Sequence, residues 1–108
     1  MKYIRFCPDG TKMYYQNNQL HREDGPAIEY ANGTKYWYQY GKYHREDGPA
    51  KEYADGSKEW YQNDKLHRLD GPAIEYVNGS KSWYYKDTKI NCSSQQEFIR
   101  FINLKAFW

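Results

Sequence analysis

The sequence predicts an all-β fold with a C-terminal helix: a single elongated antiparallel sheet of tandem 23-residue β-hairpin repeats, capped by one α-helix. Three observations predict it. A heptapeptide recurs at a 23-residue period, an Asn-Gly or Asp-Gly pair occurs in every period, and apolar residues near the C-terminus follow a helical spacing. At 108 residues we expect one domain, 1–108, with hairpin repeats over 8–89 and a capping helix over 93–107.

Two motifs define the repeat. The heptapeptide His-Arg-x-Asp-Gly-Pro-Ala begins at His21, His44 and His67. A turn pair followed by Thr or Ser and then Lys recurs at the same period, at Asp9-Gly10, Asn32-Gly33, Asp55-Gly56 and Asn78-Gly79. Chance does not align so many residues at one offset, so the period predicts an array of hairpins.

The turn chemistry predicts the strands. Asn-Gly and Asp-Gly pairs favour two-residue type I′ turns, in which both central residues have positive φ, so we expect the main turn of each hairpin there. A second, weaker turn is expected at Asn17-Asn18, Tyr40-Gly41, Asn63-Asp64 and Lys86-Asp87. Because proline lacks an N–H, the Gly-Pro corner should interrupt the ladder between units.

The expected register predicts an aromatic core. A two-residue turn at Asn32-Gly33 places Ile28 opposite Trp37 and Tyr30 opposite Lys35. A ladder of large rings then becomes the first candidate for the core, each ring worth on the order of 4–6 kcal/mol if fully buried. Its members are Tyr14, Trp37, Trp60 and Trp83, and strand alternation sends their neighbours Tyr15, Tyr38, Tyr61 and Tyr84 to the opposite face.

A single-layer sheet has no second layer to bury both ladders. One aromatic ladder should therefore stay at least partly exposed along the array, and elongated aromatic surfaces mark interaction sites. The alternative is a strongly twisted sheet whose Lys and Arg stems cover the second ladder.

The last residues predict a helix over about 94–106. Ser93-Ser94 followed by Gln95, Gln96 and Glu97 is typical of a capping box. Apolar residues then recur at helical spacing, at Phe98, Ile99, Phe101 and Ile102. We expect the helix to cover the open end of the array; docking of a partner, with Phe107-Trp108 as anchors, is the alternative.

Composition limits the partners. Sixteen basic and fourteen acidic residues give a net charge of +2, which argues against a dedicated duplex-DNA binder but not against single-stranded nucleic acid. The sequence shows no signal peptide and no run of eighteen apolar residues, so we expect a cytoplasmic protein. Reduced thiols are expected at Cys7 and Cys92, with a bridge between them as the alternative.

The His and Asp of the corner invite a catalytic or metal-binding hypothesis. His21 and Asp24 recur in every unit rather than converging in one place, and no further His or Cys pair completes a metal site. The Asp also has a structural task, because it can accept backbone N–H bonds or pair with the nearby Arg. Nucleophile-elbow, phosphate-loop and metalloprotease motifs are absent. We expect no enzyme activity, no cofactor and no metal.

The order Gly-Lys-x-His, Gly and Tyr-x-Asn-Gly on a 23-residue period resembles MORN repeats, which are hairpins stacked into an elongated twisted sheet. This chain inserts Arg-Glu-Asp or Arg-Leu-Asp between its His and Gly25, Gly48 or Gly71. It is therefore more similar to the HRxDGPA variety of MORN-like repeats found in bacteriophage and large-virus proteins. The resemblance covers 8–89 and implies a scaffold for protein or lipid contacts, in the host cytoplasm if the protein is viral.

The expected function is a non-catalytic protein-binding repeat module, in one version a phage protein that binds and inhibits a host factor. The alternatives are a single-stranded nucleic acid or anionic-lipid binder that uses Tyr and Lys ladders, and a self-assembling structural element that forms homo-oligomers. Positions that differ between units, such as Tyr36, Glu59 and Ser82, are where a specific partner could be recognised. The candidate partner-binding residues are Tyr15, Tyr36, Tyr38, Tyr61, Tyr84, Lys35, Lys58 and Glu59.

Overall fold

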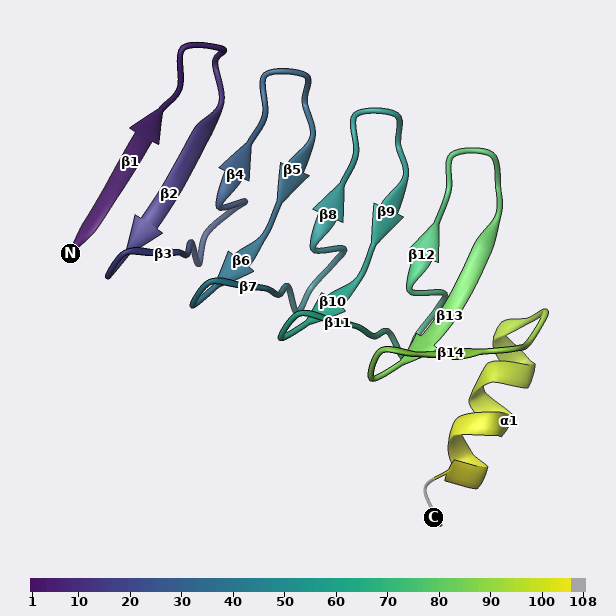
Figure 1. Ribbon diagram of the computed structural model, residues 1–108. Helices are drawn as coiled ribbons and strands as arrows, with labels where there is room; N and C mark the ends of the chain where they lie inside the picture. The colour runs from purple at the N-terminus through teal and green to yellow at the C-terminus, as the bar shows by residue number, and fades with distance from the viewer. Residues whose placement is uncertain (106–108) are drawn as a thin grey trace.

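The computed structural model describes residues 1–105, which form an open antiparallel sheet with a helix at its C-terminal end (Figure 1). Within these residues, ten strands make up the sheet, in the order β1-β2-β4-β5-β8-β9-β12-β13-β14, with β3 paired to β2. Their bounds are β1 Lys2–Phe6, β2 Lys12–Gln16, β3 Gln19–Leu20, β4 Ile28–Glu29, β5 Lys35–Tyr36, β8 Lys51–Glu52, β9 Lys58–Glu59, β12 Ile74–Glu75, β13 Lys81–Tyr85 and β14 Thr88–Ile90. The predicted fold class is confirmed.

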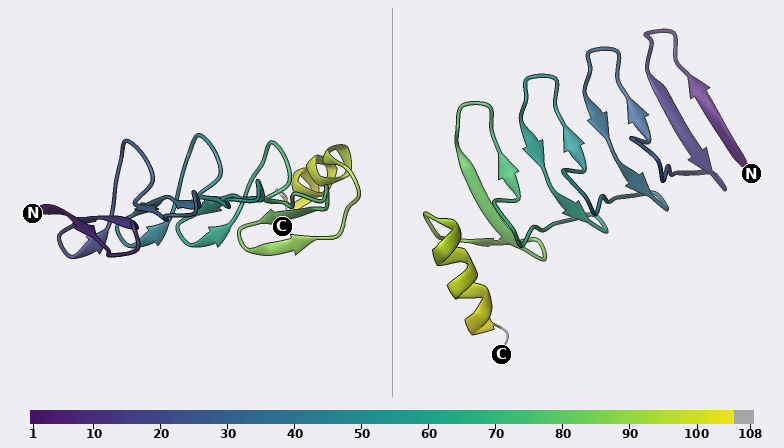
Figure 2. Two further views of the ribbon diagram at one scale, coloured as in Figure 1. Left: turned by 90° about the horizontal axis from the view of Figure 1, so that it is seen from above. Right: turned by 180° about the vertical axis from the view of Figure 1, so that it is seen from behind.

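Two short hairpins extend from one side of this sheet (Figure 1). They are β6 (Tyr38–Gln39) with β7 (Lys42–Tyr43), and β10 (Tyr61–Gln62) with β11 (Lys65–Leu66). Each unit thus contains a long hairpin and a short one, and the units stand side by side in chain order. Seen from above, the array is thin and elongated (Figure 2), with extents of 47 × 31 × 18 Å.

The two kinds of turn exchange the roles that the sequence predicted for them. At the Asn-Gly and Asp-Gly pairs only the glycine has positive φ, for example +96° at Gly33. Tyr30 N–H donates to the carbonyl of Thr34 and Gly33 N–H to the carbonyl of Tyr30, so the loop has three residues and a glycine bulge. The type I′ turns lie at the second site, where both central residues have positive φ: Asn17-Asn18, Tyr40-Gly41, Asn63-Asp64 and Lys86-Asp87.

The longer loop shifts the register by one residue. Ile28 lies opposite Tyr36, and Glu29 opposite Lys35. The predicted pairs of Ile28 with Trp37 and of Tyr30 with Lys35 are therefore wrong. Because strand side chains alternate with a period of two, this shift moves the tryptophans to the face opposite Ile28.

The N-terminal strand lies before the predicted repeats, which begin at residue 8. β1 pairs with β2 along its whole length, from Lys2 opposite Gln16 to Phe6 opposite Lys12. It takes the first-strand position of the first unit although it carries neither repeat motif. The array of hairpins therefore begins at Lys2.

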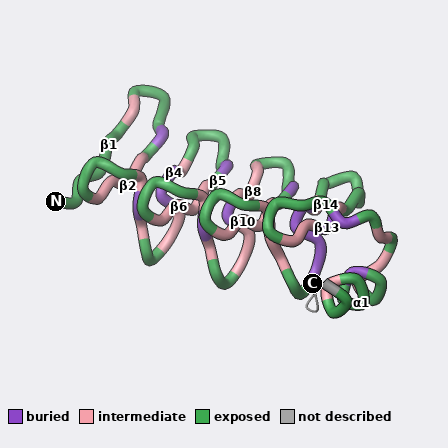
Figure 3. Tube along the Cα trace, turned by 60° about the horizontal axis from the view of Figure 1, so that its bottom comes forward, coloured by how far each residue is buried: buried purple, intermediate pink, exposed green. Residues whose placement is uncertain are grey.

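The core is not the predicted tryptophan ladder. Trp37 and Trp60 are only half-buried, and of the ladder only Trp83 is buried. The buried side chains lie instead on the corners and the strands that follow them (Figure 3), where small and β-branched residues bring adjacent units close together. They include Ala27, Ile28, Ala50, Ala73 and Ile74, with Thr11, His21, Thr34, His44 and Ser57 beside them.

The helix α1 (Gln95–Lys105) covers the end of the array, within the range predicted for it. Ser94 Oγ accepts the N–H of Glu97, and Glu97 in turn accepts the hydroxyl of Ser93, so the predicted cap is present. Phe98 is fully buried against Trp83 and Ile90. Phe107 and Trp108, the anchors in the alternative hypothesis of partner docking, lie outside the described residues.

Candidate functional site

The sheet has two chemically different faces, set by the observed register. Across β2, β4, β5, β8, β9, β12 and β13, Lys and Glu alternate on one face. We call this the arginine face; it carries Lys12, Glu29, Lys35, Glu52, Lys58, Glu75 and Lys81, the rings Tyr14, Trp37, Trp60 and Trp83, and the corner residues Arg22, Arg45 and Arg68. Each Lys thus has a Glu directly opposite, as expected for mutual screening.

On the arginine face, each corner arginine holds its own unit together. The guanidinium of Arg45 lies 3.9 Å above the centre of the Trp37 ring. Its Nε donates to Asp47 at 3.1 Å, and its Nη1 donates to the carbonyl of Pro49 at 3.1 Å and to Glu52 at 2.7 Å. Arg22 over Tyr14 and Arg68 over Trp60 repeat the arrangement. The corner Asp is therefore an ion-pair partner of the arginine, as the structural hypothesis predicted.

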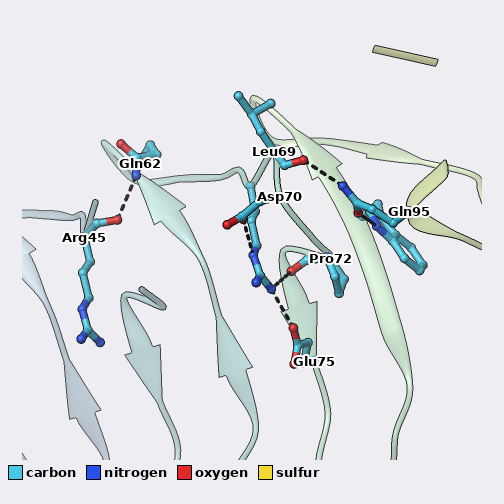
Figure 4. A network of polar contacts seen from close by, with 9 residues as sticks. Arg45, Gln62, Leu69, Asp70, Pro72, Glu75 and Gln95 are labelled. Carbon is cyan, nitrogen blue, oxygen red and sulfur yellow. Dashed lines mark hydrogen bonds and ion pairs between the residues drawn. The ribbon is translucent and has the colours of Figure 1, made fainter. Parts of the chain in front are cut away.

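The last unit replaces this arginine by the helix. Residue 91, one period after Arg68, is Asn91, and within residues 1–105 no arginine stacks on Trp83 as Arg22, Arg45 and Arg68 do on the rings of their units. Instead its Nε1–H donates to Gln95 Oε1 at 2.8 Å, and Gln95 Nε2–H donates to the carbonyl of Leu69 at 2.9 Å (Figure 4). In the same view, Asp70, Pro72 and Glu75 accept hydrogen bonds from the guanidinium of Arg68, which belongs to the preceding unit.

The opposite face is lined with tyrosines. We call it the tyrosine face; it carries Tyr15, Tyr30, Tyr36, Tyr38, Tyr43, Tyr53, Tyr61, Tyr76 and Tyr84. The short hairpin β6–β7 packs its rings against the sheet, since Tyr43 lies 5.7 Å from Tyr36 and 5.2 Å from Tyr61 between ring centres. Tyr38 lies 4.4 Å from Tyr43. The rings therefore contact one another across successive units.

A lysine and a glutamate lie in the middle of these rings. Lys51 Nζ lies 4.2 Å from the centre of the Tyr43 ring and 3.9 Å from Glu59 Oε1. Glu59 accepts the hydroxyls of Tyr53 and Tyr61 at 3.1 and 3.0 Å. Burial raises the pKa of the Tyr53 and Tyr61 hydroxyls, and the Glu59 carboxylate raises them further. The cluster therefore keeps its tyrosines protonated and presents hydroxyl and ring surface rather than phenolate.

The predicted partner-binding residues are divided between the two faces. Tyr15, Tyr36, Tyr38, Tyr61, Tyr84 and Glu59 belong to the tyrosine face. Lys35 and Lys58 are exposed on the arginine face, each opposite a Glu. The register thus separates these tyrosines from Lys35 and Lys58, the two lysines that were expected to act with them.

Sequence reasoning missed Tyr30, Tyr43, Tyr53 and Lys51 as members of the cluster. Variation between units could have found two of them, since Lys51 stands where other units have Ile28 and Ile74, and Tyr43 where they have Leu20 and Leu66. Tyr30 and Tyr53 recur unchanged and gave no such signal. The observed register places Lys51 in one row across the tyrosine face with other positions that change between units: Ile28, Tyr36, Glu59, Ile74 and Ser82.

The repeated histidines join successive units instead of forming one site. Nδ1 of His21 accepts the N–H of Tyr40, His44 that of Asn63 and His67 that of Lys86. Each acceptor serves the first residue of the next type I′ turn. Within residues 1–105 no three His, Cys, Asp or Glu side chains gather in a way that could hold a metal ion.

The two cysteines lie apart from the tyrosine cluster and are not joined to each other. Cys7 and Cys92 are free thiols, as predicted, and the alternative bridge is not formed. Burial raises the pKa of the Cys92 thiol, and Glu97 adds to this effect. In the described part of the chain, no helix has both the length and the apolar character needed to cross a membrane.

Comparisons with protein-family models, with curated proteins and with solved structures found no match to this chain.

Proposed function

We propose that this protein is a non-catalytic protein-binding repeat module whose partner docks on the tyrosine face. The observation that carries the proposal is the run of half-exposed tyrosine rings that crosses several units of an open, single-layer sheet. Tyrosine supplies large contact area at low cost in side-chain entropy and is enriched at protein interfaces. Tyr30 and Tyr76 keep 37% and 47% of their surface exposed, so the rings at the rim of the face are accessible.

The row of variable positions supports recognition of a specific partner. Tyr36, Lys51 and Glu59 differ from their counterparts in the other units, although the backbone around them repeats. Their charges and hydroxyls therefore give the middle of the face a chemistry that the outer units lack. A face of this kind favours one docked protein over a ligand that repeats along the array.

The arrangement of charge favours a protein over a nucleic acid or an anionic lipid. Polyanion binding needs cations beside the stacking rings. Here Lys12, Lys35, Lys58 and Lys81 alternate with glutamates on the other face, and the corner arginines are held by Asp and Glu. Lys51, which does lie among the rings, is 3.9 Å from the carboxylate of Glu59. The similarity to phage-type MORN-like repeats extends the proposal to a phage protein that binds and inhibits a bacterial host factor.

The proposal is tested by capture from a bacterial lysate with matched variants of the two faces. Wild-type protein and the control variant Lys58→Ser, on the arginine face, should retain the same protein in stoichiometric amount. The double variant Tyr30→Ser/Tyr76→Ser should lose it while keeping the far-UV circular dichroism spectrum of the wild type.

Reconstitution with the purified partner completes the test. Binding should fall only weakly as salt rises, whereas a steep loss with salt would support a polyanion ligand. Repeated failure to capture a stoichiometric protein, or equal loss of binding in the Lys58→Ser control, would overturn the proposal.

A further inference from the structure

The N-terminal strand leaves one edge of the sheet open. β1 pairs with β2 on one side, and on its other side no strand of the described residues pairs with it. All five of its residues are exposed, including Ile4 at 45% and Phe6 at 69%. An unbulged edge strand with exposed apolar side chains is a template for pairing with another strand.

The hydrogen bonds at its two ends show which backbone groups point outward. Cys7 N–H donates to the carbonyl of Thr11, and Asn17 N–H donates to the carbonyl of Met1. Antiparallel ladders use alternate residues, so the odd-numbered residues from 1 to 7 bond β2. The N–H and C=O groups of Lys2, Ile4 and Phe6 therefore point away from the sheet.

We propose that β1 binds β1 of a second copy of this chain, antiparallel, about a two-fold axis at Ile4. This pairing is independent of the partner that docks on the tyrosine face. The outward groups of Lys2, Ile4 and Phe6 then meet those of Phe6, Ile4 and Lys2 of the second copy. All six residues form hydrogen-bonded pairs, and the two sheets become one.

The side chains of β1 are complementary to themselves in this register. The sequence Lys-Tyr-Ile-Arg-Phe, reversed, places a ring opposite each cation. Lys2 lies opposite Phe6 of the second copy on the arginine face, and Arg5 opposite Tyr3 on the tyrosine face, where Tyr3 already stacks on Tyr15 at 4.9 Å. Cations over rings attract, whereas a parallel pairing would set Lys against Lys.

The other end of the array carries the helix. β14 is the last strand of the sheet there, and α1 packs against residues of β13 and β14. There Phe98 and Ile102 pack against Trp83, and Gln95 bonds both Trp83 and Leu69. The two ends of the array therefore differ, and a two-fold pairing of β1 uses the open edge of both copies, so the assembly stops at a dimer.

Sedimentation of the full chain at increasing concentration tests the proposal. The mass should rise from 13.1 kDa toward twice that value. Ile4→Pro removes an outward N–H and leaves the bonds to β2 intact, so this variant should stay monomeric with an unchanged circular dichroism spectrum. A wild-type chain that is monomeric up to its solubility limit, or a dimer that persists in a folded Ile4→Pro variant, would overturn the proposal.

Two matched pairs of variants test the register. Phe6→Glu places a carboxylate opposite Lys2 of the second copy and should keep the dimer, whereas Phe6→Lys places like charges opposite each other and should lose it. Ile4→Cys places two thiols across the axis and should give a disulfide-linked dimer under mild oxidation, whereas Lys2→Cys should not exceed the wild-type background from Cys7 and Cys92. Equal behaviour within either pair contradicts this register.

Discussion

The corner arginine needs a glycine three residues later in the chain. A Cβ built on Gly48 would lie 2.9 Å from Cζ of Arg45, and the same approach occurs at Gly25 and Gly71. These glycines have ordinary backbone angles, so it is the close approach of the guanidinium and not a positive φ that requires them. The motif therefore needs a Gly because the Arg of the same motif, which stacks on Trp37 or its equivalent, leaves no room for a side chain there.

Gly48→Ala should therefore destabilise the protein by about 1–3 kcal/mol, because the guanidinium of Arg45 must leave its position between the ring and the two carboxylates. Urea unfolding measures the change. The control is the double-mutant cycle with Arg45→Ala, in which the added methyl group should cost less than about 0.5 kcal/mol. A full cost in the Arg45→Ala background would show that the backbone, not the arginine, excludes the side chain.

At the scale of the element, the sequence predicted the kinds of structure better than their register. The 23-residue period, the corner and the capping helix could all be predicted because each depends on local sequence. The turn type at Asn32-Gly33 could not be predicted, because Asn-Gly suits both a two-residue type I′ turn and a three-residue loop with a glycine bulge. Asn32 Oδ1 accepts the N–H of Thr34, a local bond that stabilises the longer loop.

The one-residue shift in register also determines which side chains form the candidate site. Because of it, the tryptophans lie on the face of the corner arginines, and the tyrosines lie on the face of Ile28 and its equivalents. β1 escaped prediction for another reason: Arg5 occupies the position of Ile28 one period earlier, yet no residue around it repeats. Lys2–Phe6 pairs along its whole length with β2, the next strand in the chain, without carrying a repeat motif that marks it in the sequence.

The cap offers a test at the same scale. Phe98 is fully buried on Trp83 and Ile90, whereas Ile99, its neighbour on α1, is 40% exposed. Phe98→Ala should cost about 3–5 kcal/mol, and the matched control Ile99→Ala no more than about 1 kcal/mol. Thermal unfolding followed by tryptophan fluorescence reports both. Equal costs would mean that the helix does not close the array through its buried face.

The joint made by His67 depends on a neutral imidazole. Nδ1 of His67 accepts the Lys86 N–H, which a protonated ring cannot do. Burial lowers the pKa of His67 below its usual value, and the Lys86 ammonium lowers it further. The unfolded chain therefore binds more protons than the folded chain in this range. The contribution of the joint to stability is present above about pH 6.5 and is lost as the pH falls through the folded pKa.

The melting temperature of the wild type should accordingly fall between about pH 7 and pH 5. His67 suits the test because its corner carries Leu69 where the other corners place Glu23 and Glu46, each 3.5 Å from a histidine Nε2. His67→Gln supplies an amide oxygen that accepts the same bond without titrating, so this variant should lose less stability over that pH range. An identical pH dependence in the variant would assign the effect to other groups.

The whole molecule is a one-dimensional array in which each unit contacts its neighbours. The joints repeat at a constant spacing: Gly41 N–H donates to the carbonyl of Leu20, Asp64 to that of Tyr43 and Asp87 to that of Leu66. Small hydroxyl residues add a second contact, as Thr34 Oγ1 accepts the N–H of Ala54. Because every joint uses the same groups, the removal of one complete unit should leave a matching pair of surfaces.

Deletion of residues 51–73 tests this at the scale of the molecule. It joins Ala50 to Ile74, sets Glu75 where Glu52 accepted Arg45, and offers the N–H of Lys86 to His44 in place of Asn63. The shortened chain should fold cooperatively with a lower melting temperature, by about 4–8 °C for each kcal/mol lost with the missing unit. The deletion also removes Lys51, Tyr53, Glu59 and Tyr61 from the tyrosine face, so a partner that docks on this face should no longer bind.

Deletion of residues 28–50, of equal length, is the matched control for folding because it joins Ala27 to Lys51 and preserves the same joints. It keeps Lys51 and Glu59 but removes Tyr36 and Tyr43, so both shortened chains should fold while neither retains the complete cluster. Circular dichroism and urea unfolding measure the fold, and titration with the captured protein measures binding. An array whose units act only through their neighbours predicts two folded, non-binding chains. If either deletion unfolds the protein, stability depends on contacts beyond nearest neighbours; if both fold and still bind, the partner contacts a surface outside the tyrosine face.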